Sequence, residues 1–206
     1  MNDAPEFWDG KNRALMHRPD LLRPTVLAYG ALGLVPAGSR VLDLGSGRGR
    51  DSLLFAEAGM RVTAMDFSAV ALAALPEGVE AVKHSIADVP YPLPPASYDM
   101  VYARLSLHYF DVDTTHEVFG EIHRLLRPQG LLVALVNSID DAEYGTGRLI
   151  GPDYYELEPG DRKRYFSCDA LYGFAARWFT VRLAEQTAED ALDPFGPLVR
   201  LVAERP

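Results

Sequence analysis

The amino-acid sequence predicts an α/β fold built around one largely parallel sheet. Short apolar runs alternate with segments of helical composition from about residue 20 onward, and this alternation is typical of strand–helix units. The chain has 206 residues, of which 48% are hydrophobic and 24% charged. That length and composition predict a single globular domain over residues 1–206, with residues 1–37 forming a helical cap ahead of the sheet.

The first half of the chain is expected to hold three strands and two helices. The first apolar run is short and is followed at once by glycines, as in a buried strand. Gly59 is suited to end the helix that follows. Ser68 is suited to cap the next helix, and Pro76 ends it. These signals predict strands over 40–44, 61–65 and 79–84 and helices over 51–58 and 68–75.

The second half continues the same alternation. Four prolines within residues 90–95 exclude a helix or a central strand there. The next helix places Val118, Ile122 and Leu125 on one face and stops at Pro128, and the run after it is apolar throughout, so it is expected to be buried on both faces. We expect strands over 98–102, 131–136, 179–184 and 198–203 and helices over 114–127 and 169–177.

Residues 138–166 break this rhythm. The segment combines tyrosines, acidic residues and glycines without a regular apolar period. Such a stretch predicts a long loop or a lid over a site.

Charge limits the classes of partner. The chain has 20 Lys and Arg against 29 Asp and Glu, a formal net charge of −9. This balance argues against nucleic acid or an anionic membrane surface as the main partner, because phosphate groups are bound by basic faces. The longest uncharged stretch of note, residues 24–39, is too short for a membrane span.

Cys168 is the only cysteine. An intrachain disulfide and a cysteine-rich metal site are therefore excluded, and no other pattern of metal ligands stands out. A reducing cytoplasm is the expected location.

The most informative segment joins the first strand to the first helix of the sheet. Residues 41–51 read Val-Leu-Asp-Leu-Gly-Ser-Gly-Arg-Gly-Arg-Asp. A dinucleotide fingerprint needs Gly-x-Gly-x-x-Gly, but its third glycine position falls on Arg50 or Ser52, and no P-loop lysine follows. A carboxylate at Asp43 would also repel a diphosphate at the helix N-terminus.

Asp43 suits a cationic ligand instead. S-adenosylmethionine carries an ammonium and a sulfonium and has no phosphate. Asp66 ends the second strand, 21 residues after Gly45, where a carboxylate can accept hydrogen bonds from both ribose hydroxyls.

Four motifs together resemble the class I S-adenosylmethionine-dependent methyltransferases. They are Val-Leu-Asp-Leu-Gly-Ser-Gly-Arg-Gly at 41–49, Val-Thr-Ala-Met-Asp-Phe-Ser at 62–68, Ser-Tyr-Asp-Met-Val-Tyr-Ala at 97–103 and Arg-Leu-Leu-Arg-Pro-Gln-Gly-Leu-Leu-Val at 124–133. The resemblance covers roughly residues 38–206. It implies a Rossmann-like, seven-stranded, mostly parallel sheet with helices on both faces and an antiparallel last strand.

The resemblance also implies a role for individual residues. Asp43 and the backbone of Gly45 and Gly47 would hold the methionine moiety, Asp66 the ribose, and Phe67 would pack on the adenine. Ser85 aligns with an acidic residue that the family often has at the exit of the third strand, although Asp88 is an alternative for that role. The remaining cofactor-binding positions are Ser46, where many relatives have cysteine, Ile86 and Ala87 at the adenine edge, and Ala103, whose carbonyl would face the cofactor ammonium.

Methyl transfer is an in-line displacement that depends mainly on holding the acceptor atom in position. A base is needed only if the acceptor must lose a proton. His108, after the fourth strand, is the candidate base, because its ordinary pKa suits that task. The alternative is that His108 only packs or caps a loop. If His108 is the base, we expect His108→Ala to lower turnover with little change in cofactor affinity.

The acceptor is expected to be a small molecule, with the 138–166 segment as the lid of its site. The Asn/Asp-Pro-Pro-Tyr motif of amino-methylating nucleic-acid enzymes is missing after the fourth strand. A protein side chain is the second choice of acceptor. A non-catalytic S-adenosylmethionine-binding module and a nicotinamide-dependent oxidoreductase remain as alternatives. Phe7, Trp8 and His17 are expected either to form part of a lid over the cofactor or to fasten the N-terminal segment to the sheet.

Overall fold

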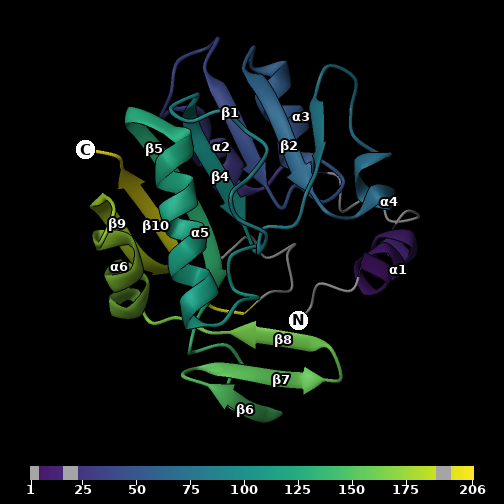
Figure 1. Cartoon of the computed structure of the whole chain (residues 1–206), viewed down its shortest axis with the longest axis vertical. Coiled ribbons are helices and arrows are strands. Elements are labelled where there is room, and N and C mark those ends of the chain that lie inside the picture. Colours follow the sequence, from purple (N-terminus) through teal and green to yellow (C-terminus); the bar gives the residue numbers. More distant parts are fainter. Residues whose placement is uncertain (1–4, 16–22, 189–195) are drawn as a thin grey trace.

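A seven-stranded sheet forms the centre of the molecule. The computed structural model describes residues 5–15, 23–188 and 196–206. The strand order is β3-β2-β1-β4-β5-β10-β9 (Figure 1). The first five of these strands are parallel, and β10 is antiparallel to both of its neighbours. The sheet confirms the predicted class and the predicted antiparallel last strand. Its strands are β1 Arg40–Leu44, β2 Arg61–Asp66, β3 Glu80–Lys83, β4 Tyr98–Arg104, β5 Leu126–Asn137, β9 Thr180–Thr187 and β10 Leu198–Glu204.

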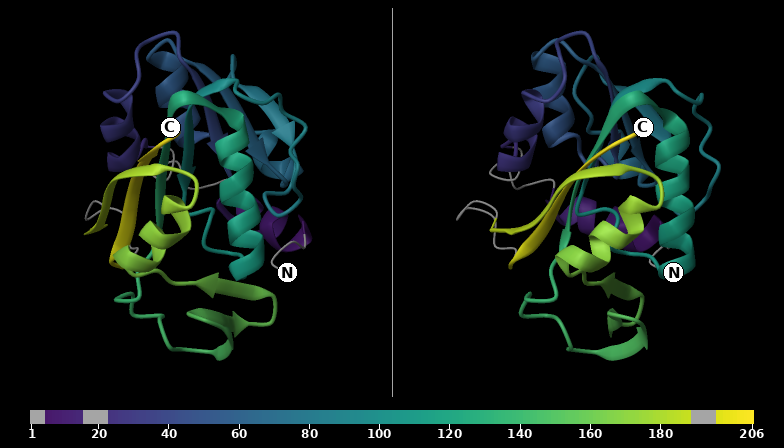
Figure 2. Two further views of the ribbon diagram at one scale, coloured as in Figure 1. Left: turned by 60° about the vertical axis from the view of Figure 1, so that its left-hand side comes forward. Right: turned by 90° about the vertical axis from the view of Figure 1, so that its left-hand side faces the viewer.

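Helices cover both faces of the sheet, because neighbouring residues of the central strands are buried on opposite sides. Two hydrophobic clusters result, one on each face. Val41 belongs to one cluster, together with Ala28 of α2 and Phe55 of α3. Leu42 belongs to the other, together with Ile122 of α5. Figure 2 shows α5 and α6 on one side of the sheet and α2 and α3 on the other. The helices are α1 Pro5–Leu15, α2 Val26–Leu32, α3 Arg50–Glu57, α4 Ala69–Leu72, α5 Val112–Leu125 and α6 Cys168–Ala176.

The helix expected over 68–75 is shorter than predicted. Ser68 caps α4 by accepting a hydrogen bond from the Ala71 N–H, as expected, but the helix ends at Leu72. Leu75 precedes Pro76. The ring of a proline clashes with the residue before it and disfavours the helical conformation of that residue. The chain therefore leaves the helix before the proline is reached.

Residues 148–164 form strands and not a long loop, which corrects part of the expectation for 138–166; the lid role of this segment stays a prediction. They contain a second, three-stranded antiparallel sheet of order β6-β7-β8, with strands Arg148–Gly151, Tyr154–Glu158 and Asp161–Arg164. Gly160 and Asp153 adopt left-handed conformations at its turns. Tyrosines supply much of its apolar packing, so the segment lacks the aliphatic period by which a strand is recognised.

Candidate functional site

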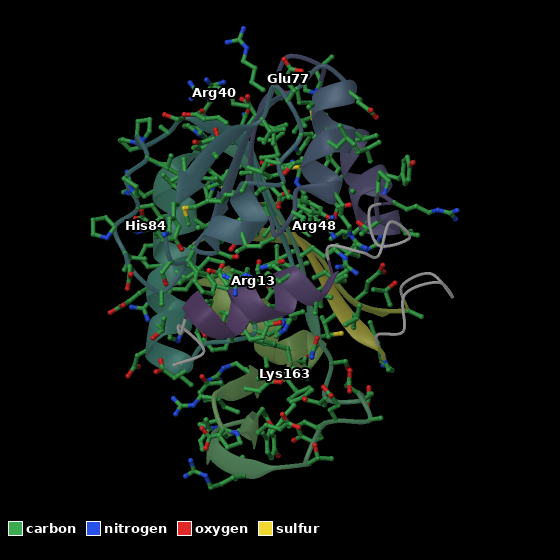
Figure 3. The ribbon with its side chains drawn as sticks, turned by 90° about the vertical axis from the view of Figure 1, so that its right-hand side faces the viewer. Arg13, Arg40, Arg48, Glu77, His84 and Lys163 are labelled. Carbon is green, nitrogen blue, oxygen red and sulfur yellow. The ribbon has the colours of Figure 1, made fainter. Side chains whose placement is uncertain are left out.

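The carboxyl ends of β1, β4 and β5 open onto a cavity of about 640 Å³. The glycine loop after β1 forms one wall, and Lys163 of β8 belongs to another. In Figure 3, Arg48 of the glycine loop and Lys163 lie above and below helix α1. The second sheet therefore contributes to the site at the end of the first, where open α/β sheets bind ligands.

A smaller cavity of about 130 Å³ adjoins the larger one. It is lined by Asp66, Phe67, Ser85 and Ile86, all of which the sequence assigned to the cofactor. The two cavities adjoin because six residues line both. The shared residues are Trp8, Asn12, Gly45, Gly47, Leu105 and Tyr109.

Two glycines of the loop are required for different reasons. Gly45 has φ +78°, and a Cβ there would lie 2.4 Å from the Cβ of Ser106. Gly47 has φ +54°, and a Cβ there would meet no atom within 4 Å. Gly45 is therefore needed for packing against the protein, whereas Gly47 borders space that is open to a ligand.

Asp43 is buried at the inner end of the larger cavity. Its Oδ2 accepts a hydrogen bond of 2.5 Å from Ser52 Oγ at the start of α3. Burial raises the pKa of Asp43 to about 7, and the nearby carboxylates of Asp51 and Asp66 act in the same direction. A cationic group beside Asp43 would restore the charged form of this carboxyl, so the position favours a cationic ligand.

Asp66 holds the glycine loop in place. One of its oxygens accepts a hydrogen bond from the Gly47 N–H at 2.9 Å, and the other accepts from the Ser68 N–H at 2.8 Å. Burial raises its pKa, while these backbone hydrogen bonds oppose that rise. The side chain lines the smaller cavity, as its predicted contact with a ribose requires.

Helix α1 covers the junction of the two cavities. The Trp8 ring meets the Tyr109 ring edge-on at 5.0 Å and the Phe67 ring at 6.4 Å. Asp9 Oδ1 accepts a hydrogen bond of 2.5 Å from Ser68 Oγ. Trp8 thus lines both cavities and packs against the residues after β2 and β4, which fits either of the two roles expected from the sequence. His17 and the side chain of Phe7 lie outside the described residues.

A network that the sequence did not reveal fixes the start of α3. Asp51 accepts hydrogen bonds from the Thr25 N–H at 2.9 Å, from Thr25 Oγ1 at 3.0 Å and from Tyr102 Oη at 2.8 Å. Thr25 also caps α2. No motif links these three residues, because they meet only after the sheet has formed.

His108 lies in an environment that weakens it as a base. Its residue is 2% exposed, and it lines the larger cavity. Burial lowers the pKa of His108 to about 3, and the cations Lys163 and Arg104 add to that effect. Nδ1 is buried and has no hydrogen-bond partner among the described residues. The imidazole is therefore neutral at neutral pH, and the base role stays a prediction that its low pKa disfavours.

Charged side chains of both signs surround the outer part of the larger cavity. Lys163 Nζ lies 2.6 Å from Glu143 Oε2, and the side chain of Lys163 is 17% exposed compared with 52% for Glu143. Arg104 and Asp141 also line this part. The more exposed Glu143 can leave this ion pair more easily than Lys163 can.

Two predicted cofactor residues line neither cavity. Ala103 is fully buried in β4 opposite Ala134 of β5, and the next residues, Arg104 and Leu105, face the larger cavity instead. Ala87 packs against the hydrophobic core, and its N–H donates a hydrogen bond to Ser85 Oγ. The cofactor contacts of Ala87 and Ala103 therefore stay predictions. The predicted residues that do line a cavity are Asp43, Gly45, Ser46, Gly47, Asp66, Phe67, Ser85, Ile86 and His108.

Two negative findings apply to the described parts of the chain. No group of three or more His, Cys, Asp and Glu side chains there is arranged to hold a metal ion. None of the helices there has the length and the apolar character needed to cross a membrane.

Comparisons with known proteins find methyltransferases. Residues 42–134 match the methyltransferase domain family. A malonyl-[acyl-carrier protein] O-methyltransferase of Pectobacterium atrosepticum is 36% identical over 104 residues, which are 49% of this chain and 40% of the relative. The enzyme of the same name from Enterobacter lignolyticus is 36% identical over 95 residues, 46% of this chain and 37% of the relative. The chain thus spans about two fifths of the length of these curated relatives.

Solved structures extend the similarity to most of the chain. The 1,6-didemethyltoxoflavin-N1-methyltransferase of Burkholderia thailandensis, solved with 1,6-didemethyltoxoflavin and S-adenosylhomocysteine, has a TM-score of 0.67 and 25% identity. That match covers 87% of this chain and 78% of the other. A putative methyltransferase of Haloferax volcanii, in complex with the activator Trm112, has a TM-score of 0.71 at 19% identity and covers 99% of this chain and 98% of its own. At that identity the similarity establishes the fold alone.

Proposed function

We propose that this chain is a class I S-adenosylmethionine-dependent methyltransferase and that it transfers a methyl group from S-adenosylmethionine to a small-molecule acceptor. S-adenosylmethionine is the cofactor of this family and supplies a methyl group activated by a sulfonium. One observation carries the proposal: the smaller cavity at Asp66 shares six lining residues with the larger cavity, which Asp43, His108 and Lys163 line.

The residues of the two cavities fit this cofactor. Asp66 and Phe67 would hold the ribose and the adenine in the smaller cavity. Asp43 would bind the cationic end of the methionine moiety, which fits a buried carboxyl whose pKa of about 7 leaves it readily ionised by a cation. The open space at Gly47 lets the ligand approach the backbone. The acceptor would then occupy the outer part of the larger cavity.

We propose further that the attacking atom of the acceptor is a carboxylate oxygen. A carboxylate reacts without losing a proton, so a neutral His108 with a pKa of about 3 is no obstacle. Lys163 and Arg104 line the larger cavity and would attract an anion. The acceptor would replace Glu143 as the partner of the Lys163 ammonium. Both curated relatives are named as O-methyltransferases of a malonyl group, which ends in a carboxylate.

A panel of acceptors tests this function. The chain is incubated with S-adenosylmethionine and with short-chain dicarboxylic half-thioesters such as malonyl-coenzyme A, each paired with its amide analogue. We expect S-adenosylhomocysteine and a methyl ester to form with the acids and not with the amides. Methylation of amines or of protein side chains only would overturn the carboxylate assignment.

Lys163→Gln provides the matched variant for this panel. Because Lys163 lines only the larger cavity, the KM of the acid should rise about tenfold, as expected for the loss of one charge-assisted hydrogen bond. The Kd of S-adenosylhomocysteine should stay within about twofold. Binding of S-adenosylhomocysteine without turnover of any acceptor would favour the non-catalytic binding module. The cytoplasmic location expected from the single cysteine belongs to the same proposal.

A further inference from the structure

The second sheet holds three successive carbonyls of the segment after β4. The Arg164 N–H donates to the His108 carbonyl at 2.7 Å. Tyr154 Oη donates to the Tyr109 carbonyl at 2.9 Å, and Arg164 Nε donates to the Phe110 carbonyl at 2.9 Å. Each carbonyl of residues 108–110 thus has one donor from β7 or β8. We name this arrangement the carbonyl clamp.

The clamped segment forms part of both cavities. His108 and Tyr109 line the larger cavity, and Tyr109 and Phe110 line the smaller one. The Tyr109 ring also packs against Trp8 of the lid helix at 5.0 Å. A shift of this segment would therefore change the shape of the cofactor cavity as well as that of the acceptor cavity.

Arg164 has the geometry of a fixed connector. Its residue is 4% exposed, and its guanidinium lies 5.4 Å from the centre of the Tyr154 ring and 5.9 Å from that of Phe174. Nη1 donates to the Pro152 carbonyl at 3.1 Å while Nε donates to that of Phe110. The planar guanidinium holds Nε–H and Nη1–H at fixed angles to one another, whereas the donors of a lysine ammonium rotate on a flexible stem.

The neighbouring residue of β8 connects the clamp to the acceptor wall. Lys163 precedes Arg164, and successive strand residues point to opposite faces. Lys163 lines the larger cavity while Arg164 is buried between the second sheet and residues 108–110. One strand thus carries the acceptor wall on one side and the clamp on the other.

We propose that Arg164 and Tyr154 are positioning residues, which fix residues 108–110 from the second sheet and so set the shape of the cofactor cavity. The proposal rests on the proposed function, since it takes the smaller cavity to be the cofactor site. Neither residue lines either of the two described cavities, so neither is expected to touch the cofactor. Their effect on binding passes through Tyr109 and Phe110.

Conservative variants test the clamp. Tyr154→Phe removes only the hydroxyl and keeps the ring beneath Arg164. Arg164→Lys keeps the backbone hydrogen bond and the charge but loses the two-directional geometry. Tyr172→Phe on the exposed face of α6 and Arg148→Lys on β6 are the matched controls. The Kd of S-adenosylhomocysteine is measured by calorimetry, and amide hydrogen exchange is measured by mass spectrometry.

We expect the Kd to rise about threefold to tenfold in both clamp variants and to remain unchanged in the controls, since a lost hydrogen bond contributes about 0.5–1.5 kcal/mol. Peptides covering residues 105–111 should exchange faster, and peptides covering 61–68 should not. A lower melting temperature with an unchanged Kd would show a structural role only and would overturn the proposal. Failure of the unmodified chain to bind S-adenosylhomocysteine would instead overturn the proposed function.

Discussion

Ser52 Oγ at the start of α3 donates a hydrogen bond of 2.5 Å to the buried carboxyl of Asp43 on β1. This contact ties the strand before the glycine loop to the helix after it. It also stabilises the charged form of a carboxyl whose pKa burial has raised to about 7. Asp43 is the residue best placed to bind a cationic cofactor. In the protein without ligand, keeping its carboxylate charged and buried lowers the stability of the fold.

Asp43→Asn separates binding from stability. The affinity for S-adenosylmethionine should fall about 10- to 100-fold, because a charge-assisted hydrogen bond contributes about 1.5–3 kcal/mol. At pH 8 the melting temperature without ligand should rise by roughly 2–8 °C, since a buried charge is removed. Calorimetry and thermal unfolding of the same preparation check both effects. An unchanged affinity would remove Asp43 from the cofactor site.

The affinity for S-adenosylmethionine should depend on pH around neutrality. Below pH 7 the free protein holds a proton on Asp43 that a cationic ligand must displace, so the affinity should fall by up to about tenfold for each pH unit below 7. Titrations between pH 5.5 and 8 measure the slope. Asp43→Asn serves as the control and should show a flat profile, and a flat profile in the unmodified chain would contradict the assignment.

The same carboxyl makes the stability of the unliganded chain pH-dependent. Its folded-state pKa of about 7 lies above the ordinary value of 3.8. The folded chain therefore binds a proton that the unfolded chain has released between these values. This contribution to stability is complete below pH 3.8 and is lost as the pH rises through 7. Urea unfolding should show the loss in the unmodified chain and less of it in Asp43→Asn.

The two loop glycines should respond differently to alanine. Gly45→Ala places a Cβ 2.4 Å from the Cβ of Ser106, and we expect a loss of about 2–5 kcal/mol of unfolding free energy from the clash and the left-handed backbone. Gly47→Ala should lose only about 1–2 kcal/mol, but its methyl group enters open ligand space and should weaken S-adenosylmethionine binding. Urea unfolding and calorimetry compare the pair. Equal stability of the two variants would show that the loop relaxes around the added atom.

His108→Asn distinguishes a catalytic base from a neutral wall residue. A general base contributes about 10²–10⁴-fold to the rate. Because burial holds the pKa of His108 at about 3, we expect kcat with a carboxylic acid acceptor to fall less than about tenfold. The pH–rate profile between 5.5 and 8 should keep its shape. A loss of 100-fold or more with unchanged cofactor affinity would restore the base role.

Local patterns were sufficient for the elements that carry the cofactor site. The strand predicted over 40–44 has those bounds in the structure, because a short apolar run ahead of glycines has few other solutions. Gly45, Gly47, Asp43 and Asp66 lie where the motifs placed them, since parallel strands bring their carboxyl ends to one edge of the sheet. The second sheet was missed because much of its packing comes from tyrosines, such as Tyr155 against Tyr144 and Tyr165, and not from a regular aliphatic period.

The amino-acid sequence by itself determined the main sheet, the glycine loop and the two acidic residues beside it, because each depends on residue types within a short window. Only the tertiary structure decided which distant groups meet them. Asp51 accepts a hydrogen bond from the Thr25 N–H, and the Trp8 ring packs against the Tyr109 ring. Arg164 donates to the carbonyl of Phe110, which lies 54 residues away in the sequence. It also decided the proton affinities of Asp43 and His108, because desolvation depends on what surrounds a group after folding.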